Sequence, residues 1–561
     1  MSGSRKFVTV TFFTALIYYI LAYIIPLGSN MPLITPDETR YAEIAREMIA
    51  SGNWVVPKLL GMDYFEKPIM GYWMNALSEI IFGYNNFAVR FASALSAGLT
   101  ALLIFFFVKR FAEDKVLAPL SALVYLGFGL IYGVGTFSVL DSQTTLFISG
   151  ALITFYFGYS ANSKLSLNGW LAICGIFTGC AFMTKGFIAF AVMAIAIAPF
   201  LIWQKDWKKL FTMAWVPIIF AVLVSLPWAL AINKQAPDFW RYFFFVEHYD
   251  RFFRASVDKT QFHTQPFWFF IPIIIGGMLP WAFHLPTAIT GFKRKYAFKK
   301  PLFRYLACWV LFPFIFFSAS SGKLATYILP CLPALSILTA YGIYWALEFD
   351  GKDKIFNITN RVLSYIFVIA VIGLVIYQIL AYFISSIPLI YTSLAGMLFA
   401  IFGVLLMAYL YRSSSKAHST MSKLILFAIA PLFVMLIRPE VTPDMVTTEI
   451  AQGQFVTDAS KYISPDTLIL AHMNMMHAVA WYLKRSDIYL WDNPGELEYA
   501  TDLPQYKYRL IKGKNGLNAL IEEQTGKGGV ATFMRGEFQE NFPVKATNEA
   551  YQNRLMFGKF D

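Results

Sequence analysis

Two adjacent carboxylates, Asp37 and Glu38, stand directly after the first long apolar run of the chain, in the stretch TPDETRYAEIAREM. Carboxylates at a membrane surface can move protons or stabilise positive charge in a transition state. The stretch also fits a helix start, with Thr35 as the N-cap, Pro36 at the first helical position and Glu38 reaching back to the Thr35 amide. Capping accounts for Glu38, whereas Asp37 is open to either interpretation.

Helical spacing favours a chemical role for Asp37. Asp37, Tyr41, Ile44 and Met48 share one face of the predicted helix, which Gly52 ends. An amphipathic helix directly after a membrane span tends to lie in the membrane interface. A carboxylate on the buried face of such a helix is costly unless it is paired or used.

A second outer element, DYFEKPIMGYW, carries a cation at a predicted helix entrance. Pro68 fits the start of another interfacial helix, with Glu66 and Lys67 just before it. The helix N-terminus and the Lys67 ammonium together would suit a phosphate. Ordinary interface anchoring by Lys and Trp is an equal alternative.

Polar side chains also stand at the ends of later spans. Asp141, in GTFSVLDSQTTLF, lies a few residues into a predicted span, where an acid is a functional candidate unless it reaches water at the helix end. Lys323 and Tyr327, in SSGKLATYILPCLPA, are four residues apart and would suit a phosphate on one helical face. Lys323 could equally be a snorkelling residue.

The loop FFFVEHYDRFFR places charges among aromatic residues. His248 could bind a metal together with Glu66, or be an interfacial histidine, since one ligand pair does not make a metal site. Arg251 and Arg254 follow it as further phosphate-binding candidates.

Composition indicates the elements that must hold these residues. The 561 residues are 57% hydrophobic, 18% aromatic and 14% charged, against about 45–50% apolar and about 25% charged in soluble domains. This is a polytopic membrane protein. The net charge is +12, but residues 440–561 hold 12 Lys/Arg and 16 Asp/Glu, a net charge of −4. The positive surplus therefore lies in loops between spans, which argues against nucleic acid binding.

Runs of about twenty apolar residues predict thirteen transmembrane helices. Their positions are 7–27, 88–108, 116–134, 138–158, 169–184, 187–203, 210–232, 266–289, 302–319, 325–346, 363–383, 388–411 and 423–438. The positive loops place the N-terminus inside, so an odd number of spans places the tail outside. The four cysteines fall in apolar runs and fit small buried hydrophobic residues.

The sequence divides into a membrane domain, 1–439, with the outer loop 28–87, and a small α/β domain, 440–561. In the tail, 467–473, 487–492 and 529–535 are predicted strands and 515–524 a helix. GKNG and GKGG fit turns and lack the Lys-Ser/Thr ending of a phosphate-binding loop, so no nucleotide is expected.

Acids, cations and aromatic residues thus gather on the outer side of a membrane bundle. An activated substrate on that side must be lipid-linked, because nucleotides are not supplied there. This pattern predicts group transfer from a lipid phosphate. A transporter or lipid flippase would instead favour broken helices and polar sites near the bilayer midplane.

The motifs, in this order along the whole chain, resemble the GT-C membrane glycosyltransferases. PDETRYAEIA together with FEKPIMGYW resembles glycosyltransferase family 83 more narrowly, the 4-amino-4-deoxy-L-arabinose transferases of lipid A. Protein O-mannosyltransferases are wider relatives, and transfer of another polyprenyl-phosphate sugar is the alternative. One departure is that Tyr249 and Asp250 follow His248, where the family has an apolar residue and Gln.

The resemblance implies transfer of aminoarabinose from undecaprenyl phosphate to a lipid A phosphate on the periplasmic face of the Gram-negative inner membrane, with inversion. That reaction lowers the negative charge of lipid A and confers resistance to polymyxin and cationic peptides. A monomer surrounded by membrane lipids is expected. The resemblance implies that Asp37 is the principal catalytic acid and Asp141 its partner near the sugar. It implies donor-phosphate contacts by Lys67 and Tyr327 with Arg251 or Arg254, and a divalent metal pair (Zn or Mg) of Glu66 with His248. From their own places in the sequence, Glu38 joins the catalytic candidates and Lys323 the phosphate-binding candidates.

Overall fold

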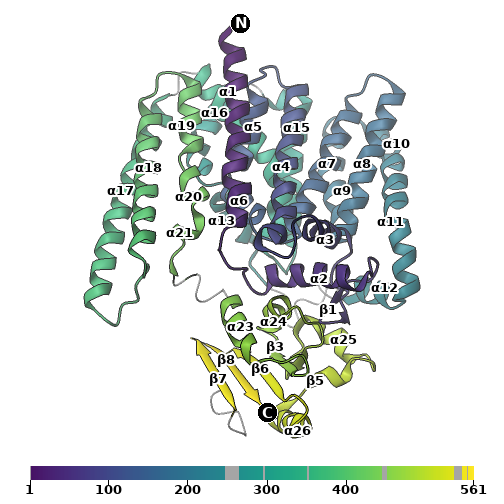
Figure 1. Ribbon diagram of the computed structural model, residues 1–561. Coiled ribbons are helices and arrows are strands. Elements are labelled where there is room, and N and C mark those ends of the chain that lie inside the picture. Colours follow the sequence, from purple (N-terminus) through teal and green to yellow (C-terminus); the bar gives the residue numbers. More distant parts are fainter. Residues whose placement is uncertain are drawn as a thin grey trace. The chain divides into compact units, whose positions relative to one another are not determined.

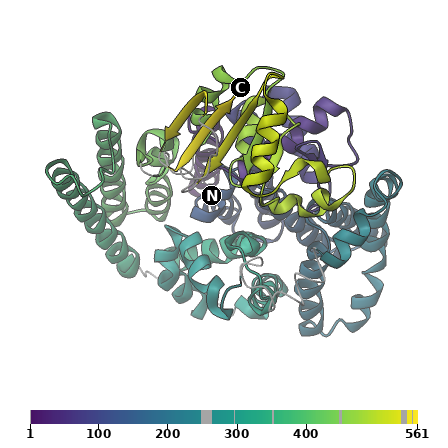
Figure 2. The ribbon, with the colours of Figure 1, turned by 90° about the horizontal axis from the view of Figure 1, so that it is seen from below.

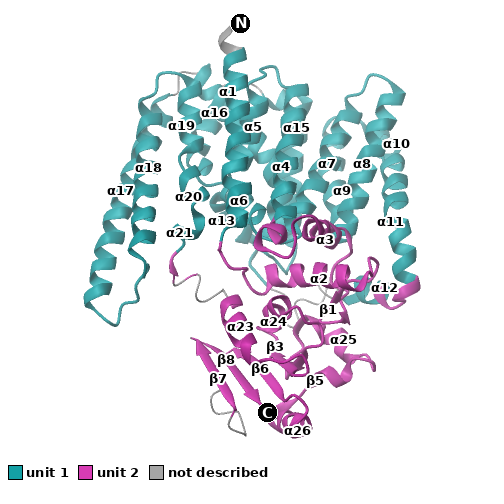
Figure 3. Cartoon of the chain, viewed as in Figure 1, with its two compact units in different colours: residues 1–29, 91–233, 240–442 teal, residues 30–90, 234–239, 443–561 magenta. Residues whose placement is uncertain are grey.

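The computed structural model of this chain describes residues 2–246, 264–294, 297–349, 353–444, 446, 452–535, 546–552 and 554–561. The chain forms two compact units (Figure 3). Unit 1 comprises Met1–Ser29, Phe91–Asn233 and Trp240–Thr442, and unit 2 comprises Asn30–Arg90, Lys234–Phe239 and Pro443–Asp561. The outer loop, which the sequence assigns to the membrane domain, thus makes its contacts with the tail.

Unit 1 is helical, as the long apolar runs predict (Figure 1). Its longer helices are α1 (Ser2–Tyr19), α4 (Asn86–Phe111, whose first turn belongs to unit 2), α5 (Leu117–Leu126), α7 (Asp141–Tyr159), α8 (Lys164–Lys185), α9 (Ile188–Trp203), α11 (Trp215–Gln235), α14 (Leu285–Arg294), α15 (Pro301–Ala319), α16 (Leu332–Glu348), α17 (Asp353–Phe383), α18 (Leu394–Lys416) and α19 (Thr420–Ile429).

Shorter segments connect or extend these helices in unit 1. They are η1 (Ile20–Ile24), η2 (Ile25–Gly28), α6 (Gly129–Gly135), α10 (Trp207–Thr212), α12 (Phe239–Arg241), η4 (Phe267–Phe269), α13 (Phe270–Gly277), η5 (Trp281–His284), η6 (Ala297–Lys299), η7 (Ala325–Cys331), α20 (Leu432–Leu436) and α21 (Arg438–Val441).

Many of these helices can cross a membrane. Among the described residues, eight are long and apolar enough, and two further pairs pass the same test but bend, by 66° between α5 and α6 and by 94° after Gly277. Apolar stretches of 10–17 residues add Ile188–Trp203 and Thr420–Leu436. Each predicted span overlaps a helix or a bent pair, although the count of thirteen stays a prediction. The chain is an integral membrane protein.

Unit 2 combines the outer loop with the tail. The loop supplies α2 (Asp37–Ser51), the hairpin β1 (Lys58–Leu59) and β2 (Met62–Asp63), and α3 (Met70–Phe82). The tail supplies the strands β3 (Leu468–His472), β4 (Tyr489–Trp491), β5 (Leu510–Ile511), β6 (Val530–Arg535), β7 (Asn548–Gln552) and β8 (Leu555–Phe560). Its helices are α23 (Gly453–Ala459), η8 (Ser460–Tyr462), α24 (Met476–Leu483), η9 (Gly495–Leu497), α25 (Glu498–Asp502), η10 (Lys507–Arg509) and α26 (Gly513–Gln524).

The tail strands form one mixed sheet in the order β5-β4-β3-β6-β8-β7, and the yellow strands at its C-terminal end lie side by side in Figure 2. The first four are parallel, with Leu470 opposite Tyr489 and Thr532, whereas β8 and β7 are antiparallel. The three predicted strands and the predicted helix are confirmed. GKGG is a turn, but GKNG forms the first turn of α26, so the turn predicted there is wrong.

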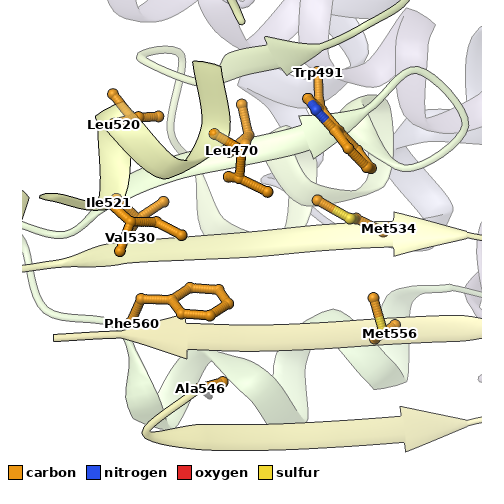
Figure 4. Close-up of a cluster of buried hydrophobic side chains, with 10 residues drawn as sticks. Leu470, Trp491, Leu520, Ile521, Val530, Met534, Ala546, Met556 and Phe560 are labelled. Atoms are coloured by element: carbon orange, nitrogen blue, oxygen red, sulfur yellow. The ribbon is translucent and has the colours of Figure 1, made fainter. Parts of the chain in front are cut away.

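Alternate residues of these strands build a core beneath α26 (Figure 4). Leu470, Val530, Met534 and Phe560 pack with Leu520 and its neighbours on α26. A second cluster joins the two parts of unit 2, because Leu33 and Ala42 of the loop pack with Trp481 of α24. The four cysteines are free, and Cys180 alone of them is only half-buried.

Candidate active site

Asp37 is the first residue of α2, where a carboxylate is favoured by the helix dipole. The predicted capping box is wrong, because Pro36 rather than Thr35 is the N-cap and no side chain among the described residues caps this end. The Asp37 side chain is 43% exposed and pairs with Arg40, one turn along. The predicted apolar face is buried at Tyr41, Ile44 and Met48, but its acid reaches the surface.

Glu38 has a structural environment. Its side chain is fully buried and forms a two-pronged ion pair with Arg90, with Nε–Oε1 and Nη2–Oε2 distances of 2.7 Å. Its Oε2 also accepts a hydrogen bond from the Ile34 amide, at 2.9 Å, rather than from Thr35. A carboxylate held by a guanidinium and an amide is shielded from substrate, so this geometry does not favour the catalytic role predicted for Glu38.

Arg40 links Asp37 to the tail within unit 2. Its Nη2 donates to Asp37 and its Nη1 donates to Glu496 of η9. The hydroxyl of Tyr64 also donates to Oε2 of Glu496, at 2.7 Å. His477 Nε2 lies 2.7 Å from Oε1 of Glu496. Burial alone would raise the pKa of Glu496, but Arg40, His477 and Tyr64 outweigh it and hold that pKa well below its usual range.

Glu66 and Lys67 lie just before α3, which begins at Met70, two residues beyond the predicted Pro68. Lys67 Nζ donates to the Glu66 carbonyl at 2.8 Å and lies 3.9 Å from its carboxylate. Both side chains are mostly buried, each 18% exposed. Among the described residues no group of three or more His, Cys, Asp and Glu side chains could hold a metal, and His248 lies outside them.

In unit 1, Asp141 is the first residue of α7 and Lys185 the last residue of α8. The Lys185 ammonium pairs with Asp141 and lies 4.7 Å from the ring centroid of Tyr327. Asp141 and Lys185 are 14% and 16% exposed. This mostly buried trio brings together two predicted site residues. It also adds Lys185, whose signal in the sequence was a lone cation between two apolar runs.

Contrary to the prediction from the sequence, Lys323 does not lie on a helical face shared with Tyr327. It precedes η7, so Lys323 and Tyr327 do not share a helical face. Its ammonium donates to the carbonyls of Gln265, at 2.7 Å, and Ser320, and the residue is buried. Two of its three N–H donors are therefore taken by backbone carbonyls, and Lys185 is the cation in contact with the Tyr327 ring. Arg251 and Arg254 lie outside the described residues.

These contacts define two sets of groups with complementary chemistry. Unit 2 carries a partly exposed carboxylate, Asp37, held by a mostly buried guanidinium, and separately a mostly buried lysine, Lys67. Unit 1 carries a carboxylate, an ammonium and a phenol in contact. Carboxylates stabilise developing positive charge, and ammonium and phenol groups stabilise a departing phosphate. Such groups suit cleavage of a bond between a sugar and a phosphate.

Two family models match this chain. The model described as dolichyl-phosphate-mannose-protein mannosyltransferase matches residues 8–243, and the model described as the C-terminal domain of arabinosyl transferase ArnT matches residues 448–558. The first lies mainly in unit 1 and the second in unit 2.

Curated relatives match nearly the whole length. An undecaprenyl phosphate-alpha-4-amino-4-deoxy-L-arabinose arabinosyl transferase of Shewanella sediminis is 38% identical over 88% of each chain. One from Proteus mirabilis is also 38% identical, over 92% of this chain and 91% of its own. The crystal structure of ArnT from Cupriavidus metallidurans bound to undecaprenyl phosphate superposes with a TM-score of 0.79 at 22% identity, covering 99% and 98% of the two chains. The fold is GT-C.

Proposed function

The chain belongs to the undecaprenyl phosphate-aminoarabinose arabinosyl transferases, and we propose that it transfers 4-amino-4-deoxy-L-arabinose to a lipid A phosphate at the periplasmic face of the inner membrane. The observation that carries this proposal is 38% identity to named relatives over about nine-tenths of each chain. The chain is a glycosyltransferase. Lower negative charge on lipid A would then give resistance to polymyxin and cationic peptides.

The proposed reaction is a single displacement. An anionic oxygen of the acceptor phosphate attacks the anomeric carbon, the bond from that carbon to the donor phosphate breaks, and undecaprenyl phosphate leaves with the electron pair. Positive charge builds on the sugar in an oxocarbenium-like transition state. Because the acceptor is already an anion, no strong base is needed. The anomeric configuration inverts.

Asp37 is proposed to face this positive charge, on the oxocarbenium or on the sugar ammonium. Its exposure and its place at the start of α2 support this role. Asp141 is proposed as its partner near the sugar. Lys67, Tyr327, Arg251 and Arg254 are proposed to bind the donor phosphate, and the contacts of Lys185 with Asp141 and Tyr327 support adding it to them.

The divalent metal pair of Glu66 and His248 stays a proposal, and no step above needs it. The metal content of purified wild type and His248→Ala tests it. Bound Zn or Mg that is lost in the variant would support the pair, and equal contents would remove it.

The test uses a polymyxin-sensitive Gram-negative strain that makes the lipid donor but lacks its own transferase. Wild type, Asp37→Asn and a matched control, Asp466→Asn, are expressed, and lipid A is analysed by mass spectrometry. Asp466 is an exposed tail acid. We expect a gain of one aminoarabinose with wild type and control, and a loss on the order of a hundredfold or more with Asp37→Asn.

Two other results are possible in this experiment, and each contradicts a different part of the proposal. A full gain with Asp37→Asn would remove Asp37 from the chemistry but keep the reaction. No gain with wild type present in the membrane would overturn the aminoarabinose assignment. The match of residues 8–243 to the mannosyltransferase model would then favour another polyprenyl-phosphate sugar.

A further inference from the structure

A buried chain of contacts runs from the tail to the carboxylate of Asp37. We propose that Glu496 is a positioning residue for Asp37 and acts on it through Arg40. The proposal rests on the catalytic role proposed for Asp37. It gives the tail a part in the chemistry.

The contacts form a continuous path inside unit 2. Glu496 accepts from Arg40 through Oε2, and Arg40 donates its other terminal nitrogen to Asp37. Arg40 is 15% exposed and Glu496 is 14% exposed, whereas Asp37 at the end of the path is 43% exposed. The path therefore leads from a mostly buried ion pair to a carboxylate that faces solvent.

The fold fixes the tail end of this path. Glu496 follows β4 in η9, and His477 follows β3 at the start of α24. Because β3 and β4 are neighbouring parallel strands, both side chains come from the same carboxyl edge. That edge is where open α/β sheets place their ligands. Here it holds Arg40, a side chain of the same chain, which sits where a ligand would sit in other sheets of this kind.

Glu496 is well fixed. Arg40 and Tyr64 both donate to one of its oxygens, and His477 contacts the other. A carboxylate with partners on both oxygens has little freedom to rotate. The Tyr64 hydroxyl is itself buried, with the residue 1% exposed, so it cannot exchange Glu496 for water easily.

The consequence for Asp37 follows from the shape of the guanidinium. Glu496 accepts from one terminal nitrogen of Arg40 and Asp37 accepts from the other, so the two carboxylates together fix the orientation of the guanidinium. One oxygen of Asp37 then stays available to face the sugar. Without the negative charge of Glu496, Arg40 would turn towards Asp37 and bind both of its oxygens. Asp37 would keep its charge but lose its orientation.

The test measures steady-state kinetics with purified full-length protein, undecaprenyl phosphate-aminoarabinose and lipid A. Glu496→Gln keeps the size of the side chain and removes its charge. We expect kcat to fall on the order of tenfold to a hundredfold with little change in KM for the donor, because misorientation of a catalytic group affects the transition state more than binding. The matched control is Glu498→Gln, which changes an exposed acid two residues further along the chain. We expect this control to leave kcat unchanged.

A purely structural role predicts something different. If Glu496 only docks the tail on the outer loop, the variant lowers the melting temperature and the yield of folded protein, but kcat per folded molecule stays at the wild-type value. That result overturns the proposal. A fall in kcat with wild-type melting supports it.

A second variant decides the case in which Glu496→Gln fails to fold. Tyr64→Phe removes one hydrogen bond to Glu496 and leaves every charge in place. We expect a fall in kcat of about threefold at near-normal melting temperature, because losing one hydrogen bond to the carboxylate loosens Glu496 but leaves its charge and its other partners in place. Wild-type kcat in this variant overturns the proposal. Wild-type protein is the control for the reaction itself. If wild type transfers no aminoarabinose, the proposed function is overturned, and the result says nothing against the positioning role of Glu496.

Discussion

The acids at the two ends of α2 differ in how far cations compensate their burial. At its start, Glu38 is paired with Arg90, and Asp37 is tied through Arg40 to Glu496, so each carboxylate has a cation. Towards its end, Glu43, Glu47 and the facing Glu79 of α3 are all buried with fewer cations.

The acids at the end of α2 are only partly compensated. Glu43 accepts from Arg46 at 2.8 Å, and Glu47 accepts from the Gly61 amide at 2.9 Å. Neither carboxyl oxygen of Glu79 has a hydrogen-bond partner among the described residues. Burial raises the pKa of all three, that of Glu47 to about 8 and that of Glu79 well above its ordinary value.

A further cation that interacts with Glu43 and Glu79 is also desolvated. Lys484 lies 3.2 Å from the ring centroid of Trp481, and burial lowers its pKa to about 8, against the pull of Glu43 and Glu79. The buried acids on and beside α2 thus differ in their contacts: Glu38 and Glu43 each accept from an arginine, whereas Glu47 accepts from an amide and Glu79 has no hydrogen-bond partner among the described residues.

The largest effect on stability is expected from breaking the buried pair at the start of α2. Arg90→Leu leaves Glu38 buried without its cation and should lower the free energy of unfolding by about 3–5 kcal/mol. Asp37→Asn, at an exposed position, should change it by less than about 1 kcal/mol. Denaturant unfolding of the detergent-solubilised protein measures both. Equal losses in the two variants would contradict the contrast between Glu38 and Asp37.

Replacing both partners sharpens the same test. In Glu38→Leu with Arg90→Leu, no charge is left unpaired, so much of the stability should return. If the double variant is no more stable than Arg90→Leu, the loss comes from packing rather than from the unpaired carboxylate.

A smaller effect, of opposite sign, is expected at the far end of α2. Burial and the charge of Glu43 raise the pKa of Glu47 from 4.5 to about 8, so the folded chain binds an extra proton between these values. Stability from this group is therefore present below pH 4.5 and is lost as the pH rises to 8. Glu47→Gln should be more stable than wild type at pH 8, by on the order of 1–2 kcal/mol, and similar to it at pH 5.

Melting temperatures of wild type and Glu47→Gln from pH 5 to pH 8 check this prediction. Glutamine keeps an oxygen to accept from Gly61, so the hydrogen bond is retained. Parallel curves for the two proteins would show that Glu47 is ionised in the folded state, and the contrast between the helix ends would fail.

The smallest effect concerns the residue that ends α2. Gly52 has a φ of 68°, and a Cβ built there meets no atom within 4 Å. Gly52→Ala should therefore cost about 1 kcal/mol through backbone strain alone, and Gly52→Asn less, because Asn tolerates the left-handed region. Thermal melting checks the order of the three proteins. Equal melting temperatures would show that this helix end does not depend on the left-handed cap.

Local patterns predicted much of the fold. The long apolar runs located the helices, the short apolar stretches in 467–473 and 529–535 located β3 and β6, and Gly52 marked the end of α2. Strands β5, β7 and β8 were missed. The two-residue strand β5 is too short to show a period, and β7 is largely exposed. The capping box failed because the helix starts one residue later than predicted and Glu38 binds Arg90, fifty-two residues away, together with the Ile34 amide instead of the Thr35 amide.

The sequence by itself determined a polytopic membrane chain, its α/β tail and the candidate acids Asp37 and Asp141, because hydropathy, short apolar stretches and motif spacing are local properties. Tertiary structure alone decided which groups these acids meet. Lys185 contacts Asp141, Arg40 and Glu496 hold Asp37, and Lys323 is bound by carbonyls. Ion pairs form between whichever charges folding brings within a few ångströms, and separation along the chain carries no information about that distance.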